Sequence, residues 1–120
     1  MISESILRQK SYAFALKIIS VYKQIVAQHK EYVLSKQFLK AGTSIGALIR
    51  EAEFAQSKAD FISKLSISLK EANETDYWIL LLRDSNYITF ETAKELLTNG
   101  KELISMLVSS IKTAKQSLGK

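Results

Sequence analysis

Apolar residues recur every three or four positions along nearly the whole chain. Toward the C-terminus the steps alternate between four and three without a break. This row consists of Ala93, Leu97, Gly100, Ile104, Leu107, Ile111, Ala114 and Leu118. A helix places such a row on one face, whereas a strand repeats every second residue. The spacing therefore predicts an amphipathic helix that runs unbroken through Asn99–Gly100, a pair that in isolation favours a hairpin turn.

Three earlier segments show the same helical period. The first row is Phe14, Ile18, Val21 and Ile25, and the second is Leu34, Phe38, Ala41, Ile45, Leu48, Ala52 and Ala55. The third contains Ile62, Leu65, Leu69 and Ala72, then Trp78, Ile79, Leu81 and Leu82, with Asp76 interrupting it. Together the rows predict four helices.

Capping and turn residues separate these helices. Ser57 is a plausible N-cap because an acid, Asp60, follows three residues later, and Thr89 can cap the fourth helix. The third helix is expected to end at 85–87, and the first turn to lie around 29–31, where the apolar pattern changes phase. Four helices of about 25 residues, each about 35–40 Å long, result. Short connections favour antiparallel neighbours, so we expect an all-α, up-down-up-down four-helix bundle forming a single domain over residues 1–120.

Composition narrows the function classes. Hydrophobic residues make up 47% of the 120 residues, which argues against intrinsic disorder. The absence of cysteine excludes disulfide frameworks and thiolate chemistry, and a single histidine makes histidine metal sites and triads implausible. Glu71 and Glu74 lie three apart and resemble an acid pair, but acids on a solvated helix face are common. We therefore expect a protein that is not an enzyme and has no cofactor or metal.

The chain also lacks targeting signals. No basic segment followed by an apolar run begins the sequence, and no apolar run approaches the roughly 20 residues of a membrane span. We expect a soluble, cytoplasmic protein without a membrane partner.

Charge is the most informative functional feature. The formal net charge is +5, distributed as +6 over residues 1–50, −4 over residues 51–95 and +3 over residues 96–120. The first, second and fourth helices, which are neighbours in an up-down bundle, are then expected to be basic, and the third helix acidic. A basic field on one side of the molecule attracts polyanions. The residues expected to contact RNA or DNA phosphates are Lys10, Lys17, Lys36, Lys40 and Arg50. The alternative is a solubilising surface of mixed charge.

Base recognition has little support in the sequence. The candidate exposed aromatic residues are Tyr12, Tyr22 and Tyr32, and Tyr22 falls on an apolar row. Nucleic-acid binding is therefore expected to be independent of sequence.

A second group of residues suggests self-association. Gly42 and Gly46 each cost about 1 kcal/mol in a helix relative to alanine, so close helix–helix approach, within the bundle or across a subunit boundary, is expected to offset them. The competing interpretation is a surface where hydroxyls approach phosphate. An acidic third helix can meet a basic face of the next copy and close a ring. The expected oligomer-interface residues are Gly42, Gly46, Glu71, Glu74, Tyr77 and Trp78, although core packing explains Trp78 equally well.

Two long stretches resemble a known family. GTSIGALIREA at 42–52 and SKADFISKLSISLKEA at 57–72, followed by ETDYW at 74–78, are similar to the bacterial four helix bundle protein family, also called the 23S rRNA intervening-sequence protein family. The resemblance extends over essentially the whole chain. One departure is Leu48, where relatives usually carry Asn, which suggests that packing replaces a polar contact.

The resemblance implies an assembly and a context. Members tend to form homopentamers with a central channel, and no enzymatic activity is attached to the family. Some are encoded within large-subunit ribosomal RNA genes, and a related branch comprises accessory proteins of diversity-generating retroelements, which partner a reverse transcriptase and bind nucleic acid. Two functions remain open: direct nucleic-acid binding, and a protein-interaction adaptor such as an accessory subunit of a nucleic-acid enzyme.

Overall fold

Four helices make up the fold in a computed structural model that describes the backbone of residues 2–118 and the side chains of residues 6–117. They are α1 (Ile2–His29), α2 (Leu34–Glu53), α3 (Lys58–Asp84) and α4 (Phe90–Leu118). No strand occurs in residues 2–118, so the predicted all-α class is confirmed.

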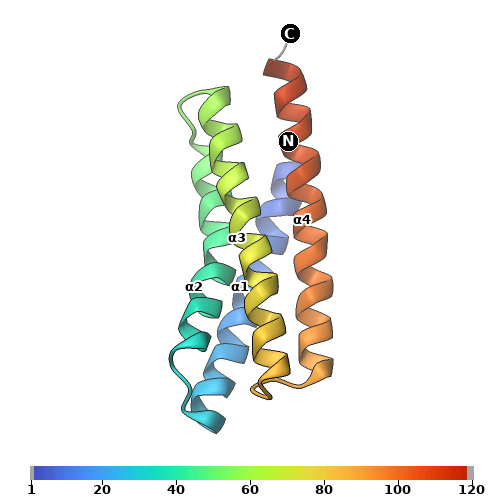
Figure 1. The fold of residues 1–120 in the computed structure, drawn as a ribbon. Helices are drawn as coiled ribbons and strands as arrows, with labels where there is room; N and C mark the ends of the chain where they lie inside the picture. The colour runs from blue at the N-terminus through green and yellow to red at the C-terminus, as the bar shows by residue number, and fades with distance from the viewer. Residues whose placement is uncertain (1, 119–120) are drawn as a thin grey trace.

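The helices pack side by side in an elongated molecule of 52 × 22 × 20 Å. Helix α1 contacts α2 and α4, and α3 contacts the same two helices from the opposite side. The α1–α2 and α3–α4 turns lie at one end, and the α2–α3 turn lies at the other (Figure 1). This arrangement is compatible with the predicted four-helix bundle.

The apolar rows point into the core where the period places them. Phe14, Ile18 and Ile25 of α1 are fully buried, as are Phe38 and Ile45 of α2. Their burial removes several large side chains from water, which is the main favourable contribution to folding. The predicted rows are therefore confirmed at their centres, while their edge members are half-buried. Residues of this kind include Leu34, Leu48, Leu69, Leu97 and Ile104.

The predicted caps are observed. The backbone N–H of Asp60 donates to Ser57 Oγ at 3.0 Å, and the N–H of Thr92 donates to Thr89 Oγ1 at 3.0 Å. Each hydroxyl satisfies one of the amides that a helix start leaves without a partner. Helix α4 continues through Asn99–Gly100, as the unbroken apolar row predicted.

The α1–α2 turn contains a cap that the sequence analysis missed. Lys30 adopts a left-handed backbone conformation (φ 51), and the carboxylate of Glu31 then turns back onto the first amides of α2. It accepts hydrogen bonds from the N–H groups of Val33, Leu34 and Ser35 at 2.8, 2.9 and 2.8 Å. Burial works to raise the pKa of Glu31, but these amide donors outweigh it and hold the pKa below its ordinary value.

Gly42 requires a correction. A β-carbon at Gly42 would lie 2.7 Å from Cγ1 of Ile18, which is fully buried in the same chain. The close approach therefore lies inside the bundle, between α1 and α2, and the expectation of a subunit boundary at Gly42 is wrong. Gly46, one turn further, also faces α1, with its missing β-carbon 3.3 Å from Ser11 Oγ. Gly46 is half-exposed, because it lines a surface groove between α1 and α2.

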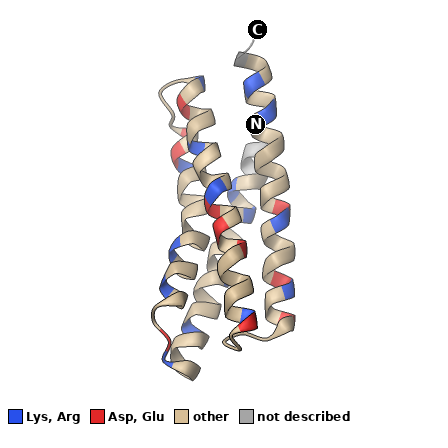
Figure 2. Cartoon of the chain, in the orientation of Figure 1, with Lys and Arg blue, Asp and Glu red and all other residues tan. Residues whose placement is uncertain are grey.

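The contrast in charge between helices is smaller than the sequence ranges suggested. With the observed boundaries, α1 carries a net +3, α2 and α4 each +1, and α3 only −1. The difference arises because acids in the range 51–95 fall on α2 and α4 as well as α3. Basic and acidic residues accordingly mix along the visible helices (Figure 2). The acidic members outside α3 are Glu51, Glu53, Glu91 and Glu95.

Candidate nucleic-acid interface

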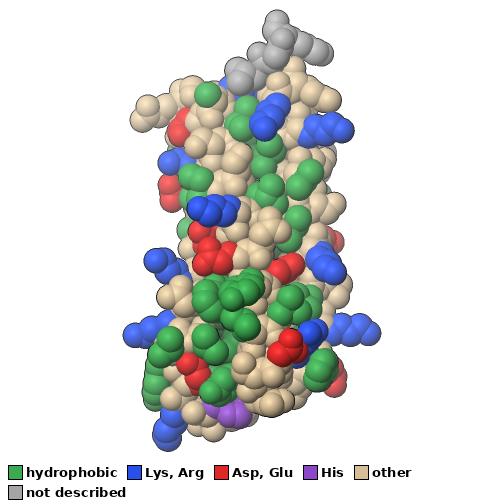
Figure 3. Space-filling view, in the orientation of Figure 1, with side chains coloured by type: hydrophobic (Ala, Val, Ile, Leu, Met, Phe, Trp, Pro, Cys, Tyr) green, Lys and Arg blue, Asp and Glu red, His purple; other side chains and the backbone are tan. Residues whose placement is uncertain are grey.

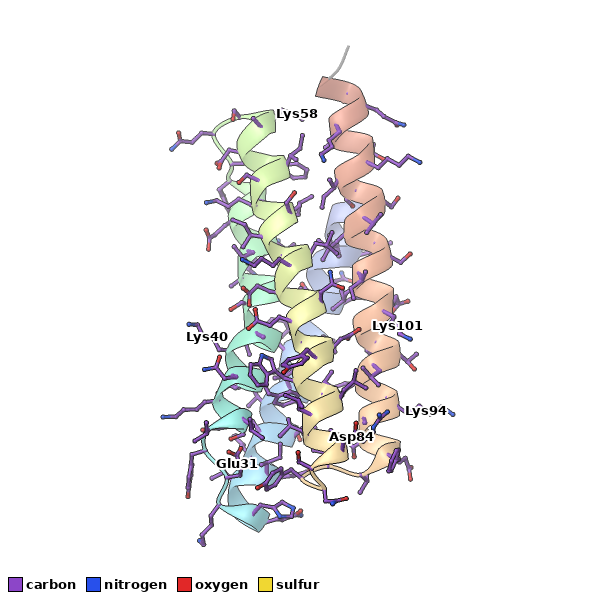
Figure 4. All side chains as sticks on the ribbon, in the orientation of Figure 1. Glu31, Lys40, Lys58, Asp84, Lys94 and Lys101 are labelled. Carbon is purple, nitrogen blue, oxygen red and sulfur yellow. The ribbon has the colours of Figure 1, made fainter. Side chains whose placement is uncertain are left out.

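The five predicted phosphate-binding residues do not share one surface. Two lie on the outer face of α2, two lie between α1 and α4, and one lies between α1 and α2. Lys36 and Lys40 lie on α2, where both are exposed, and Lys40 extends from the outer side of the bundle (Figure 4). Within residues 6–117 neither lysine forms an ion pair. These two cations are therefore directly accessible to an anion.

Lys10 and Lys17 lie instead between α1 and α4. Lys10 Nζ is 3.2 Å from Glu102 Oε2. Lys17 Nζ is 3.7 Å from Glu95 Oε2 and donates to Asn99 Oδ1 at 3.1 Å. Exposed pairs of this kind contribute little to stability, but they place a carboxylate beside each lysine. A phosphate at either position must compete with that carboxylate.

Arg50 lies at the far end of α2, in the groove between α1 and α2. Its guanidinium carbon is 5.7 Å from the centroid of the Tyr12 ring, which is the distance of a cation–π contact. Ten residues separate Arg50 from Lys40, which corresponds to about 15 Å along the helix. The structure therefore does not gather the five predicted residues into one site.

Arg8 is a basic residue of this groove that the sequence analysis did not select. It precedes Tyr12 by one helical turn and borders the same surface hollows as Tyr12 and Arg50. Its guanidinium Nη1 is 3.7 Å from Glu53 Oε1. The four-residue spacing of Arg8 and Tyr12 was the available signal, but Arg50 joins them only through helix packing.

The exposed aromatic residues are partly as predicted. Tyr12 and Tyr32 are 56% and 49% exposed, whereas Tyr22 packs against the hydrophobic core. Of these three tyrosines, only Tyr12 has an arginine against its ring among the residues that the structure describes. A second arginine–aromatic contact places Arg83 5.1 Å from the centroid of the exposed Phe90 ring, but Arg83 also pairs with Asp84.

The α3 side of the molecule contains four of the expected interface residues, which are Glu71, Glu74, Tyr77 and Trp78. Hydrophobic side chains gather over α3 and along its margins (Figure 3). Tyr77 is 56% exposed and meets Trp78 edge to face, with ring centroids 5.2 Å apart. Trp78 is half-buried and its Nε1 donates to Glu74 Oε1 at 3.3 Å. Ile67 and Leu80 are further exposed apolar residues of α3, and with Tyr77 and Trp78 they make up what we call the α3 face.

Glu71 and Glu74 do not form an isolated acid pair. Both are half-buried on α3, and Glu74 Oε1 accepts a hydrogen bond from Trp78 Nε1. Asp76 differs because it faces α4. Its Oδ1 is buried without a hydrogen-bond partner among the described residues. Burial raises the pKa of Asp76, and the nearby charge of Lys101 works against that rise.

Two other kinds of site are absent from the residues that the structure describes. Within residues 2–118, no group of three or more His, Asp or Glu side chains could hold a metal ion. None of the helices formed by those residues is both long enough and apolar enough to cross a membrane.

The fold and its surfaces define an all-α helical-bundle protein with two arginines and a tyrosine in the groove between α1 and α2, and with exposed apolar side chains on α3. The chain belongs to the 23S rRNA-intervening sequence protein family, which matches residues 3–109. The resemblance inferred from the 42–52 and 57–72 stretches is thereby confirmed.

A solved relative has the same fold. It is a protein of unknown function from the S23 ribosomal protein family of Bacteroides thetaiotaomicron VPI-5482, with a crystal structure at 1.70 Å resolution. The two are 51% identical, the match covers 92% of this chain and 98% of that chain, and the TM-score is 0.90. No curated protein matches the sequence.

Proposed function

We propose that this protein is a non-enzymatic, nucleic-acid-associated bundle that binds the phosphate backbone of RNA or DNA through α1 and α2. The observation that carries the proposal is the exposed pair Lys36 and Lys40, which has no carboxylate partner within residues 6–117. Arg50 extends this cationic line along α2. The family name, which refers to a sequence within 23S rRNA, supports an RNA context in the bacterial cytoplasm.

Phosphate contacts make such binding depend steeply on salt. Each phosphate neutralised by a lysine or arginine releases counterions and adds about 0.7 to 0.9 to the slope of log affinity against log salt. Lys10 and Lys17 contribute by exchanging Glu102 and Glu95 for phosphate, so we expect each to contribute less than Lys36 or Lys40.

The test is fluorescence anisotropy of a labelled structured RNA and a labelled single-stranded DNA at about 50 and 200 mM salt. The Lys36→Glu/Lys40→Glu variant is compared with Lys112→Glu/Lys115→Glu, which changes the net charge equally but on α4. We expect the α2 variant to bind more weakly and to lose about 1.4 to 1.8 from the salt slope, while the α4 variant stays close to wild type. Absence of binding at the lower salt, or equal losses in both variants, would refute direct binding through α2.

We propose further that copies of the chain assemble into a ring, a pentamer by family resemblance. The α3 face supports this, because exposed Tyr, Trp and large aliphatic residues are typical of interface cores. A heterologous contact between this face and the more basic side of the next copy closes into a ring when the rotation permits. Five copies would carry a formal charge of +25, which strengthens the attraction for polyanions.

Size-exclusion chromatography with light scattering tests the ring. Leu80→Glu is expected to reduce the mass to that of a monomer, while Leu16→Glu, which alters an exposed leucine of α1, retains the oligomer. A wild-type monomer at micromolar concentration, or a Leu80→Glu protein that remains oligomeric, would argue against this interface.

A second candidate function is a protein-interaction adaptor, such as an accessory subunit of a reverse transcriptase or another nucleic-acid enzyme. The same exposed α3 face favours it. The adaptor predicts nucleic-acid binding only in the presence of its partner, whereas the first proposal predicts binding by the purified protein alone.

A further inference from the structure

The groove between α1 and α2 combines an exposed aromatic ring with two guanidinium groups. Arg50 approaches the Tyr12 ring at 5.7 Å, and Arg8 lies one turn away on α1. Both arginines are exposed, and both line the same surface hollow as Tyr12. A surface lysine on α2 offers charge alone, whereas this cluster offers charge and a flat apolar surface together.

Small residues form the floor of the groove. Helices α1 and α2 pack closely where Gly46 faces Ser11, with 3.3 Å between the missing β-carbon and Ser11 Oγ. A hollow of about 160 Å³ remains beneath Arg8, Tyr12 and Arg50, next to one of about 270 Å³ that also borders Gln9. The other residues lining the smaller hollow are Ser11, Ala15, Thr43, Gly46 and Ala47.

The charge in the groove is not balanced. Glu53 pairs with Arg8 at 3.7 Å, while Arg50 has no carboxylate partner within residues 6–117. The cluster therefore retains a net positive charge. Arginine binds phosphate oxygens through two parallel N–H donors and also stacks on planar groups, which lysine does not do in the same way.

A nucleotide has the chemistry that uses all of these features. Its phosphate pairs with a guanidinium, and its base stacks on an aromatic ring, a contact worth about 1–3 kcal/mol per base. A free phosphate has no use for Tyr12, and a base inside a duplex is already stacked and presents no free face. The combination selects an unpaired base.

We propose that the groove formed by Arg8, Tyr12 and Arg50 binds one unpaired nucleotide of a single-stranded nucleic acid, with its base on Tyr12 and its phosphate on Arg50. This inference rests on the proposed function and deepens it, because Lys36 and Lys40 contact phosphates alone. The groove lies about 15 Å along α2 from Lys40, so a strand held there continues along the cationic outer side of that helix. Single strands are consequently preferred over duplexes.

The experiment uses three labelled probes of equal length: a single-stranded oligothymidylate, the same strand with abasic sites throughout, and a duplex. Wild type is expected to bind the oligothymidylate about 5- to 150-fold more tightly than the abasic strand, the range that one stacked base supplies. Tyr12→Ala is expected to lose the same factor on the oligothymidylate and nothing on the abasic strand. Tyr12→Phe, which keeps the ring, and Tyr32→Ala, which removes an exposed tyrosine elsewhere, are expected to bind like wild type.

Salt dependence separates the two parts of the site. Tyr12→Ala is expected to leave the salt slope unchanged, whereas Arg50→Ala lowers it by about 0.7, the value for one phosphate contact on a single strand.

Failure of this inference differs from failure of the proposed function. If wild type binds the oligothymidylate and the abasic strand equally, phosphate binding stands and the nucleotide site is overturned, a result that requires no variant to fold. Equal losses in Tyr12→Ala and Tyr32→Ala, or a change of oligomeric mass in Tyr12→Ala, also overturn it. If no probe binds wild type, both proposals fail.

Discussion

The α1–α2 and α3–α4 seams both contain a glycine at a point of close approach, but the two glycines face different partners. Gly42 faces Ile18, a fully buried aliphatic residue, with 2.7 Å between the missing β-carbon and Ile18 Cγ1. Gly100 faces Asp76, with 3.1 Å between its missing β-carbon and Asp76 Oδ1. One glycine makes room for apolar packing and the other makes room for a carboxylate.

The consequence is that the two seams respond differently to substitution and to pH. Packing around Gly42 is rigid because Ile18 has no exposed side to move toward, and protein interiors tolerate extra volume poorly. The α3–α4 seam contains a buried carboxylate oxygen without a hydrogen-bond partner in the described chain. Such a group costs free energy when it is ionised. Four substitutions test this difference between the α1–α2 and α3–α4 contacts.

Gly42→Ala is expected to have the largest effect. The new methyl group would overlap Ile18, so we expect the free energy of unfolding to fall by about 1–3 kcal/mol even though alanine favours the helix. Chemical denaturation measures the loss. Gly46→Ala is the control, because Ser11 Oγ is its nearest neighbour and the groove there is half-exposed, so its loss should be smaller. Equal stability of Gly42→Ala and wild type would contradict the packing argument.

Glu31→Gln tests the turn that closes the α1–α2 seam. Loss of the carboxylate that accepts three amide hydrogen bonds is expected to cost about 0.5–2 kcal/mol at neutral pH. Because the pKa of Glu31 is lowered on folding, its contribution is present above the unfolded-state pKa and is lost as pH falls through the folded-state pKa. Thermal melts across acidic pH should show this loss in wild type and not in the variant. Glu91→Gln, an exposed acid in the first turn of α4, is the matched control.

Asp76→Asn is expected to have the opposite sign. Burial raises the pKa of Asp76, so its contribution is fully present below the unfolded-state pKa and is lost as pH rises through the folded-state pKa. At neutral pH the amide should therefore stabilise the protein, by less than about 1 kcal/mol because the carboxyl group is only partly buried. Melting temperatures of both proteins should converge toward acidic pH. A variant less stable than wild type at neutral pH would show that the charge of Lys101 outweighs burial.

Gly100→Ala is expected to have the smallest effect, within about 0.5 kcal/mol of wild type. The gain in helix propensity is offset by contact with Asp76 Oδ1, which is the end of a side chain and can shift. A double-mutant cycle with Asp76→Asn measures the coupling between these two residues. A loss as large as that of Gly42→Ala would remove the distinction between the two seams.

Local features of the chain were predictable because they depend on residues close in sequence. The helical period, the caps at Ser57 and Thr89 and the passage of α4 through Asn99–Gly100 all follow from interactions over four residues or fewer. The interruption of the third apolar row by Asp76 was also visible in the sequence. Family membership was equally readable, because the 42–52 and 57–72 stretches are continuous.

The candidate site was predictable only in part. Arg50 and the exposure of Tyr12 were anticipated, but their contact, with Arg8 beside it, joins segments about 40 residues apart in sequence. The pairing of Lys10 with Glu102 crosses 92 positions and could not be read from charge counts over ranges.

The sequence by itself therefore determined the four helices, the caps that start the third and fourth, and which side of each helix faces the core, because periodicity and capping are local. It did not determine the start of the second helix, which Glu31 caps, or its end at Glu53. Tertiary structure decided how the helices rotate and how closely they approach. That rotation placed Gly42 against Ile18 inside the bundle, put two predicted lysines beside carboxylates of α4, and left Arg50 on Tyr12 in an open groove. The physical reason is that side chains on different helices meet only after packing sets the distance and the angle between them.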